Sequence, residues 1–178
     1  MSTVTLHDKE FELLIAKKEI KQSIKGMAEK INQDYIGKEL CVVGVLDGAF
    51  MVLSGLLKRL QLNVSLELIK LKSYEGENST GAVRKLIGLT TSLKDKHVLI
   101  VEDIIDTGHT LEYVMELIKA HEPASIETAT LLIKPDVFKD KFPVRYQGLV
   151  IPNKFVVGFG MDYDGQGRQL PDIYAATD

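Results

Sequence analysis

Cysteine is nearly absent from this sequence. Cys41 is the only one among 178 residues, so no disulfide can form within the chain. It lies in the apolar run CVVGVL, where a buried structural thiol is far more common than a nucleophile. The four histidines, His7, His97, His109 and His121, lack the spacing of zinc ligands. The sequence therefore gives no indication of a disulfide scaffold or a zinc site.

Long apolar segments and a strong charge are also missing. No window approaches the ~20 apolar residues of a membrane span, and the start, MSTVTLHDKEFELL, lacks the basic and then apolar order of a signal peptide. The net charge of −3 gives no electrostatic case for nucleic acid or an anionic membrane. We therefore expect a cytoplasmic protein that binds neither, and that holds any phosphate through local groups.

The bulk composition is that of an ordinary globular protein. Hydrophobic residues make up 45% of the chain and charged residues 26%, and 178 residues can bury a sizeable core. We find no internal repeat, low-complexity tract or linker rich in proline and serine. We expect one domain over residues 1–178, with a small additional lobe.

The first part of the chain has the pattern of an α/β fold. Apolar residues spaced by three or four predict a helix over residues 9–31. The run Leu40–Leu46 predicts a buried strand, Asp47-Gly48 a tight turn, and the following apolar face a helix over residues 48–60, which is also a candidate interface between subunits. A strand, turn and helix in this order form the first half of a βαβ unit.

A long polar segment follows the next strand. Residues 62–71 alternate as a strand does, whereas residues 72–81 are polar and have no period. Loops of this length in compact domains are usually lids, binding loops or disordered segments, and a dispensable surface insertion is the alternative. Residues 83–89 can return as a strand, which would make the segment a long hairpin arm.

The stretch HVLIVEDIIDTGHTL, from His97 to Leu111, organises the rest of the chain. Val98–Val101 is typical of a parallel strand buried on both faces, and we expect the strand to stop at the pair Glu102-Asp103. A polar turn then leads into an amphipathic helix. Ligands of open α/β sheets bind beyond the carboxyl ends of strands, and a helix start offers free N–H groups to an anion. The stretch predicts carboxylates for a sugar or metal beside a cradle for a phosphate.

Two further strands lead to polar residues. Residues 126–133 predict a strand that ends at Lys134, and residues 155–159 predict another, which Asp162 and Arg168 follow. Structural roles are open for each of these residues, because most lysines are solvated, phenylalanine is usually core and aspartate is common in turns. The same holds for the polar residues of the central stretch, which are ordinary helix caps and turn residues. Taken singly, none of them identifies a function.

In their order, these motifs resemble one protein family. The strand, the acidic pair and Asp-Thr-Gly-His-Thr resemble the phosphoribosyl-pyrophosphate signature of type I phosphoribosyltransferases. LLIKP, NKFVVGFGMDYD and KSY are similar to the purine branch, the hypoxanthine (hypoxanthine-guanine) phosphoribosyltransferases. The resemblance extends from about Leu40 to about Leu170. It implies a parallel sheet flanked by helices, a small hood from the chain ends that includes residues 150–178, and a mobile active-site loop over residues 72–85.

The resemblance also implies a reaction. Such enzymes use Mg²⁺ to join a purine base to the ribose of phosphoribosyl pyrophosphate, releasing pyrophosphate and a nucleoside monophosphate. For this chain it implies hypoxanthine and guanine as bases, IMP and GMP as products, and a homodimer or homotetramer. The preference between the two bases, the use of xanthine and the oligomeric state are not determined by the sequence.

Roles for the central residues follow from the resemblance. Glu102 and Asp103 match the acidic pair that holds the ribose hydroxyls and the magnesium shell, where oxygen ligands suit Mg²⁺. Asp106 matches the proposed proton acceptor for a purine nitrogen, and such a base is typically worth ~10²–10⁴ in rate. Five consecutive residues match the 5′-phosphate loop: Asp106, Thr107, Gly108, His109 and Thr110.

Roles for the base and pyrophosphate sites come from later in the chain. Lys134 matches the lysine that donates to the purine 6-oxo group, which would select against adenine. Phe155 matches the ring stacked on the base, and Val156 the residue whose backbone reads the edge of the base. Asp162 matches a magnesium-linked carboxylate that is also counted in the purine site, and Arg168 matches the arginine that meets pyrophosphate.

The pyrophosphate turn departs from the family pattern. Leu46, Asp47 and Gly48 match a turn in which some relatives carry a basic residue, whereas the middle residue here is acidic. We infer that the turn binds through backbone N–H groups and that Asp47 points away. The family often has a non-proline cis peptide at this turn, which a sequence cannot reveal. Ser73 and Tyr74 match the mobile loop that closes over the site and excludes water.

A regulator of the same fold, which binds nucleotide or phosphoribosyl pyrophosphate without turnover, is the main alternative. Such proteins can share the central motif and act on nucleic acid. The acidic net charge, the lack of an appended DNA-binding segment, and the joint presence of Asp106, Lys134 and Arg168 count against it. A dehydrogenase is disfavoured because no Gly-x-Gly-x-x-Gly follows a strand.

Overall fold

The larger of two sheets forms the centre of the molecule. A computed structural model of the chain describes residues 2–73, 83–139 and 141–177. The strand order in this sheet is β5-β4-β3-β6-β7-β8. The five strands β4, β3, β6, β7 and β8 run parallel, and β5 is antiparallel to β4. The α/β class with a parallel central sheet is confirmed. The strands are β3 (Leu40–Leu46), β4 (Val64–Ser73), β5 (Val83–Ile87), β6 (His97–Ile105), β7 (Ser125–Ile133) and β8 (Tyr146–Val150).

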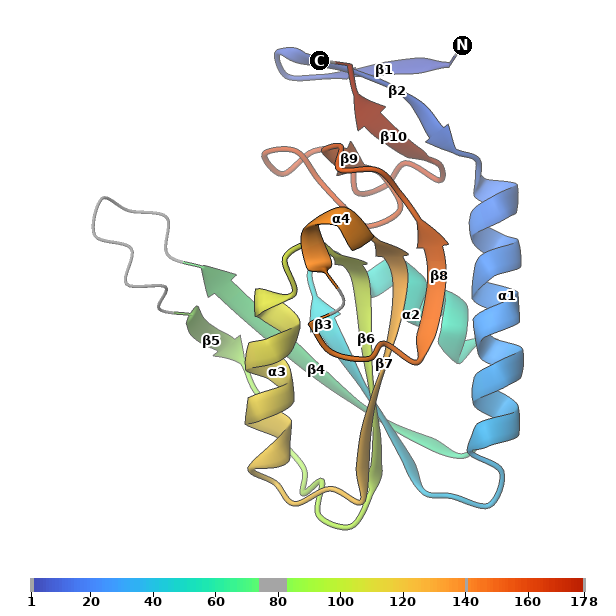
Figure 1. Cartoon of the computed structure of the whole chain (residues 1–178), viewed down its shortest axis with the longest axis vertical. Helices are drawn as coiled ribbons and strands as arrows, with labels where there is room; N and C mark the ends of the chain where they lie inside the picture. The colour runs from blue at the N-terminus through green and yellow to red at the C-terminus, as the bar shows by residue number, and fades with distance from the viewer. Residues whose placement is uncertain (1, 74–82, 140, 178) are drawn as a thin grey trace.

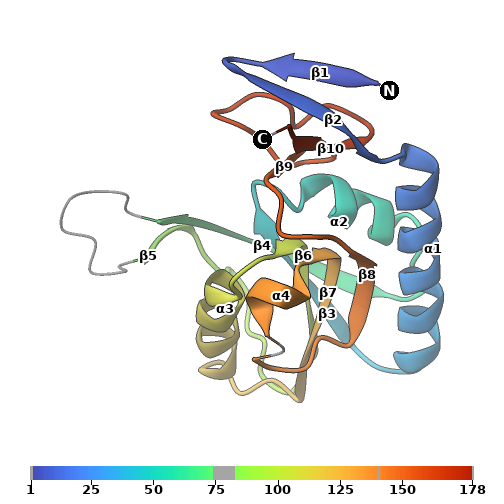
Figure 2. The ribbon, with the colours of Figure 1, turned by 45° about the horizontal axis from the view of Figure 1, so that its top comes forward.

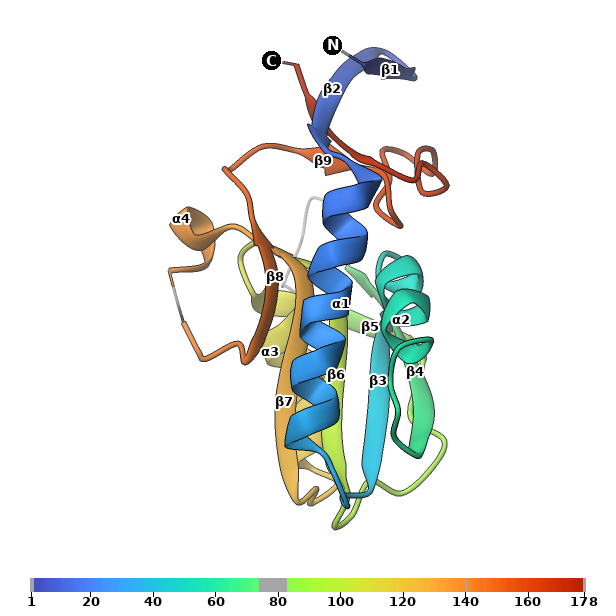
Figure 3. The same cartoon turned by 90° about the vertical axis from the view of Figure 1, so that its right-hand side faces the viewer.

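Helices cover both faces of this sheet (Figures 1 and 3). The helices α1 (Lys17–Asp34) and α2 (Phe50–Leu57) pack on one face and α3 (His109–Lys119) on the other, while α4 (Pro135–Phe138) is one turn after β7. Side chains along β3 alternate between the two cores, and all but Leu46 are buried. Cys41 is among the buried ones, and burial raises the pKa of its thiol.

The second sheet has four antiparallel strands from both ends of the chain, in the order β1-β2-β10-β9. It lies beyond the carboxyl ends of the parallel strands, and both termini are in it (Figures 1 and 2). Its small core is built on the fully buried Phe11. This sheet confirms the hood predicted from the chain ends. Its strands are β1 (Thr3–Leu6), β2 (Lys9–Ile15), β9 (Val156–Val157) and β10 (Ile173–Ala176).

The predicted helix over residues 9–31 is wrong at its start, since Lys9–Ile15 form the strand β2. This segment pairs with the adjacent β1 on one edge and with β10, from the other end of the chain, on the other edge, and this pairing outweighs the local helical spacing. Helix α1 begins at Lys17, after Ala16 donates its N–H to the Glu19 carboxylate at 3.2 Å.

Two other strand ends differ from the prediction. The strand β6 continues through Glu102 to Ile105, because it stays paired with β7 as far as Ile133. The predicted strand over residues 155–159 shrinks to β9, because Gly158 and Phe159 turn the chain with φ of +96° and +48°.

Other predicted elements are found. The strand Leu40–Leu46 has the predicted bounds, and β5 returns antiparallel to β4 as a hairpin arm. The helix predicted over residues 48–60 is shorter, spanning Phe50–Leu57. Most of the predicted mobile loop, with Tyr74, lies outside the described residues, and of Ser73 only the backbone in β4 is described. Among the helices that the structure describes, none combines the length and apolarity that crossing a membrane requires.

Candidate active site

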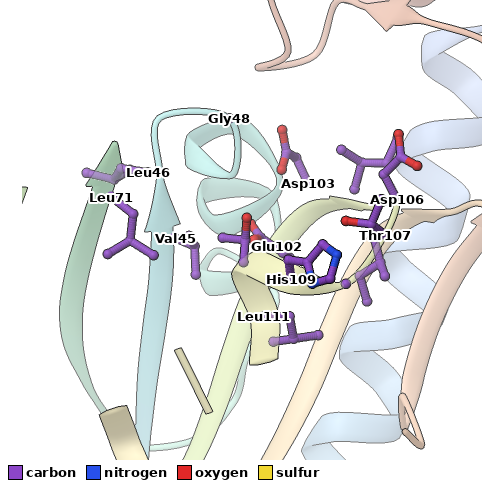
Figure 4. Close-up of a pocket in the computed structure, with 14 residues that line it drawn as sticks. Val45, Leu46, Gly48, Leu71, Glu102, Asp103, Asp106, Thr107, His109 and Leu111 are labelled. Carbon is purple, nitrogen blue, oxygen red and sulfur yellow. The ribbon is translucent and has the colours of Figure 1, made fainter. Parts of the chain in front are cut away.

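A hollow of about 350 Å³ opens where β3 and β6 end (Figure 4). It lies at the carboxyl ends of the parallel strands, which is where α/β sheets bind ligands. The predicted acidic pair and phosphate loop both contribute to its wall. The lining residues are Val45, Leu46, Gly48, Leu71, Glu102, Asp103, Ile104, Ile105, Asp106, Thr107, Gly108, His109, Thr110 and Leu111.

The start of helix α3 forms one side of this hollow. Gly108 precedes the helix with φ of +83°, and a Cβ there would press on the Phe138 ring, so the turn requires glycine. The first N–H groups of a helix have no partner within it, and the helix dipole makes this end positive. Thr107 and Thr110, both exposed residues, add hydroxyl groups at the same end. The arrangement suits a phosphate group.

Two adjacent carboxylates form another part of the wall. Glu102 is only 6% exposed, and burial, together with the neighbouring Asp103 carboxylate, raises its pKa well above the usual range. Burial also raises the pKa of Asp103 to about 6. Asp103 packs so closely on Gly48 that a Cβ at residue 48 would overlap its carboxylate. Burial makes the ionised form of both carboxylates unfavourable, and a cation bound beside them would offset this effect.

The described part of the chain contains no cluster of three His, Cys, Asp or Glu side chains able to hold a metal by themselves. Mg²⁺ in phosphate-binding sites is usually held by one or two carboxylates, with substrate phosphates and water completing its shell. The pair Glu102 and Asp103 fits that smaller requirement.

A second hollow, of about 330 Å³, adjoins the first. The two share Gly48, Asp103, Ile104 and Asp106. The tertiary structure thus gathers in one place the ends of β3, β6 and β7 and the segment around β9. The residues that only the second hollow adds are Lys134, Phe155, Val156, Met161, Asp162 and Arg168.

Asp106 and Lys134 form an ion pair at the border of the two hollows. The Lys134 ammonium lies 2.7 Å from the Asp106 carboxylate, and Lys134 is only 5% exposed. Its backbone N–H also donates to the Ile105 carbonyl at 3.0 Å. Phe155, 49% exposed, lines the second hollow and offers an aromatic surface there. This hollow combines a ring, a fixed cation and a carboxylate.

The Leu46–Asp47 peptide is cis, in agreement with the resemblance. The Asp47 carboxylate accepts hydrogen bonds from the Lys70 ammonium at 2.7 and 2.8 Å, and Asp47 lines neither hollow. This agrees with the inference that the side chain points away from the site. Sequence reasoning did not find Lys70, which lies opposite Leu46 in the register of β3 and β4, and no local motif marks it.

Arg168 joins the chain after β9 to the same turn. Its guanidinium donates to the Gly160 carbonyl at 2.8 Å and forms ion pairs with the Asp162 carboxylate at 2.8 Å and the Asp47 carboxylate at 3.9 Å. The backbone at Gly160 packs directly on the Gly48 carbonyl, which leaves no room for a Cβ. The loop that carries Asp162 and Arg168 is therefore docked on the Leu46–Gly48 turn.

Comparison with known proteins assigns the chain to a family. Residues 13–164 match the phosphoribosyl transferase domain model. The chain is 41% identical over 165 residues to the hypoxanthine-guanine phosphoribosyltransferase of Dictyostelium discoideum, with 90% of this chain and 92% of that protein covered. The chain belongs to this phosphoribosyltransferase family. The resemblance drawn from the motifs is confirmed.

Solved structures of family members have the same fold. The hypoxanthine phosphoribosyltransferase of Staphylococcus aureus superposes with a TM-score of 0.87 at 38% identity, covering 93% of this chain and 91% of that one. The Trypanosoma cruzi enzyme, solved as a ternary substrates complex, gives a TM-score of 0.86 at 38% identity, with 93% and 95% covered. At these identities the phosphoribosyltransferase fold extends over almost the whole chain.

Proposed function

We propose that the protein transfers the phosphoribosyl group of phosphoribosyl pyrophosphate to hypoxanthine and guanine, giving IMP or GMP and pyrophosphate in purine salvage. The observation that carries the proposal is the Asp106–Lys134 ion pair. It lies where the first hollow, which suits a phosphate, meets the second hollow, which Phe155 lines. A base and a ribose phosphate held in the two hollows would meet at this pair. Relatives named hypoxanthine-guanine phosphoribosyltransferase support the choice.

In this proposal the first hollow holds the ribose phosphate. The turn from Thr107 to Thr110 and the start of α3 donate hydrogen bonds to the 5′-phosphate. Glu102 and Asp103 accept hydrogen bonds from the ribose hydroxyls. Asp103 also faces the pyrophosphate turn, because it packs on Gly48.

The second hollow holds the purine. Phe155 stacks on the ring, and the backbone of Val156 reads its edge. The Lys134 ammonium donates to the 6-oxo oxygen of hypoxanthine or guanine. Adenine presents an amino group at that position, which would leave a buried ammonium facing another donor, and unpaired buried groups make such discrimination steep.

Asp106 is the proposed catalytic base. As a purine nitrogen forms its bond to the ribose carbon, the bond from that carbon to pyrophosphate breaks. The proton of the purine passes to the Asp106 carboxylate. Lys134 holds this carboxylate at 2.7 Å and so fixes its direction. A positioned base contributes ~10²–10⁴ in rate.

The pyrophosphate site is proposed at the Leu46–Gly48 turn. Backbone N–H groups of the turn and the Arg168 guanidinium bind pyrophosphate oxygens, and Asp47 stays turned toward Lys70. Residues 72–85, with Ser73 and Tyr74, are proposed to close over the site and exclude water.

Magnesium is the proposed cofactor. The buried carboxylates Glu102 and Asp103 would hold it, with Asp162 linked to its shell, and substrate oxygens would complete the shell. When bound, Mg²⁺ neutralises charge that develops on the leaving pyrophosphate.

A homodimer or homotetramer is proposed through the outer side of α2 and β4. Phe50 and Leu66 are 42% and 47% exposed there, and Leu66 shares the α2 side of the sheet with Val42, its partner in the register. Light scattering on the wild type and on Leu66→Lys tests this, with a smaller oligomer expected for the variant. A cytoplasmic location stays a prediction that cell fractionation would test.

A purine panel tests the proposed function. The protein is mixed with Mg²⁺, phosphoribosyl pyrophosphate and one of hypoxanthine, guanine, xanthine or adenine, and pyrophosphate release is measured. Release is expected with hypoxanthine and guanine, none with adenine, and none after excess EDTA. Tight binding of phosphoribosyl pyrophosphate without release in any mixture would favour the alternative, a regulator that binds without turnover.

A further inference from the structure

The hairpin turn between β1 and β2 lies against the loop that follows β9. The Tyr163 hydroxyl donates to the Asp8 carboxylate at 2.8 Å, and His7 Nε2 lies 3.2 Å from the Asp164 carbonyl oxygen. The rings of His7 and Tyr163 meet edge to face, 5.7 Å apart. These contacts join residues from opposite ends of the chain.

Tyr163 in turn packs on Phe155. The two ring centroids are 5.8 Å apart with an interplanar angle of 78°. Phe11 lies behind both rings, 6.2 Å from Phe155 and 6.0 Å from Tyr163, and is fully buried. Phe155 therefore has one part in the second hollow and another part against two aromatic neighbours, Phe11 from β2 and Tyr163 from the loop after β9.

A cation completes this group. The Lys9 ammonium lies 4.9 Å from the Tyr163 ring centroid and 6.0 Å from that of Phe155, within the range of a cation–π contact. Lys9 follows Asp8 directly, so two adjacent residues of the hairpin hold Tyr163, one at its hydroxyl and one at its ring.

We propose that Tyr163 is a positioning residue for purine binding, and that the β1–β2 hairpin holds it in place through Asp8 and Lys9. The inference rests on the proposed function, since it takes Phe155 as the ring on which the base stacks. A half-exposed phenylalanine can rotate about two torsions, and a base that stacks on it must stop that rotation. A ring already held by Tyr163 and Phe11 loses less freedom on binding, which strengthens affinity.

The expected effect separates positioning from general stability. A merely structural role for Tyr163 would weaken every substrate alike or lower the melting temperature without changing selectivity. A positioning role acts on the base alone. Phosphoribosyl pyrophosphate is proposed to bind through the first hollow, the Leu46–Gly48 turn and Arg168, and it does not stack on Phe155, so its KM should stay nearly constant.

Steady-state kinetics give the first test. Tyr163→Leu is expected to raise the KM for hypoxanthine about tenfold, the order expected for loss of aromatic contacts, with kcat and the KM for phosphoribosyl pyrophosphate within about twofold. Tyr163→Phe keeps the ring and should restore most of the affinity, while Asp8→Asn should have a small effect of the same kind. Tyr113→Leu, an exposed tyrosine on α3, is the control and should change nothing.

The absence of tryptophan from the chain allows a second test. Phe155→Trp places a single indole at the platform, and its fluorescence reports base binding without turnover. Adding Tyr163→Leu to this protein is expected to lower the anisotropy of the indole and to weaken hypoxanthine binding by the same factor as the KM. Unchanged anisotropy and affinity would overturn the inference, as would equal losses for both substrates.

Failure of the proposed function has a different signature. If the wild type releases no pyrophosphate with any purine, the function itself is overturned, and the inference with it. If the wild type turns over and Phe155→Trp gives no response to hypoxanthine, only the assignment of Phe155 as the platform fails, which also overturns the inference.

Discussion

The Lys134 ammonium and the Asp106 carboxylate lie 2.7 Å apart, although 28 residues separate them in the chain. The contact forms because β6 and β7 are parallel neighbours whose ends align, with Ile105 opposite Ile133. Lys134 is only 5% exposed, and Asp106 gives its buried ammonium an oppositely charged partner. One contact thus links Asp106, the proposed catalytic base, to Lys134, the proposed hydrogen-bond donor to the purine.

Asp106→Asn is expected to lower turnover by about 10²–10⁴, the usual contribution of a positioned base, and to spare phosphoribosyl pyrophosphate binding. An amide keeps the shape of the carboxylate but does not accept the proton. Single-turnover rates measure the chemical step, and calorimetry measures binding. Unchanged turnover would remove Asp106 from the role of base.

Lys134→Ala is expected to lower kcat/KM for hypoxanthine and guanine by about 10² or more, because the 6-oxo oxygen loses its donor and Asp106 loses its partner. Kinetics with both bases measure the change. Lys119→Ala, on the exposed side of α3, is the control and should behave as the wild type. Equal kinetics for Lys134→Ala and the wild type would count against the assignment.

Lys70→Met is expected to raise the KM for phosphoribosyl pyrophosphate about fivefold. The change removes the nearest cation of the Asp47 carboxylate and leaves only the more distant Arg168 beside it, so that about 1 kcal/mol of repulsion with pyrophosphate is expected at this turn. Asp47→Asn alone should be close to wild type, and the double variant should recover to within about twofold. If the double variant is as weak as Lys70→Met, Lys70 contacts the substrate itself and the explanation by repulsion is wrong.

Glu67→Gln tests a buried carboxylate away from the site. Burial tends to raise its pKa, but hydrogen bonds from Thr91 at 2.7 Å and from Thr90 outweigh this effect, and the pKa is lowered from its ordinary 4.5. A lowered pKa in the folded state means that the carboxylate stabilises the fold above pH 4.5, and that this stability is lost as the pH falls toward the folded-state pKa.

The free energy of unfolding of Glu67→Gln should therefore be lower than that of the wild type by about 1–3 kcal/mol at neutral pH, and by less at pH 3.5. Calorimetric unfolding between these pH values measures the difference. Glu116→Gln removes a surface ion pair and should cost almost nothing at either pH. A constant cost across the pH range would show that Glu67 contributes only its shape.

Gly160→Ala is expected to lower activity and stability together. Residue 160 has φ of +107°, and a Cβ there would overlap the Gly48 carbonyl of the pyrophosphate turn. Gly165→Ala is the matched control, since φ is +81° but no atom lies within 4 Å of its Cβ. Both variants strain the backbone by about 1 kcal/mol, and only Gly160→Ala should also raise the KM for phosphoribosyl pyrophosphate. Equal kinetics for the two would show that the docked loop does not control the turn.

Much of the central layer could be predicted from local sequence. The strand Leu40–Leu46 is apolar on both faces, which only a strand between two helix layers tolerates, and its bounds were predicted correctly. The start of α3 was also predictable, because Gly108 and the polar residues around it form a local signal. Such elements depend on neighbours within a few residues.

Other features depended on partners far along the chain. Lys9–Ile15 became a strand because β10, from the other chain end, pairs with it, and no local pattern reveals that partner. The length of β6 was decided by β7 in the same way. Backbone hydrogen bonds between distant strands outweigh the weak local preferences of a short segment.

The sequence by itself determined the family, the parallel sheet and the residue types available for chemistry, because long motifs and apolar runs are local properties. Only the tertiary structure decided which polar side chains meet. It paired Asp47 with Lys70, Asp106 with Lys134 and Asp8 with Tyr163. Side-chain hydrogen bonds act over about 3 Å, so strand register and sheet order, which the sequence does not state, select the partner of each group.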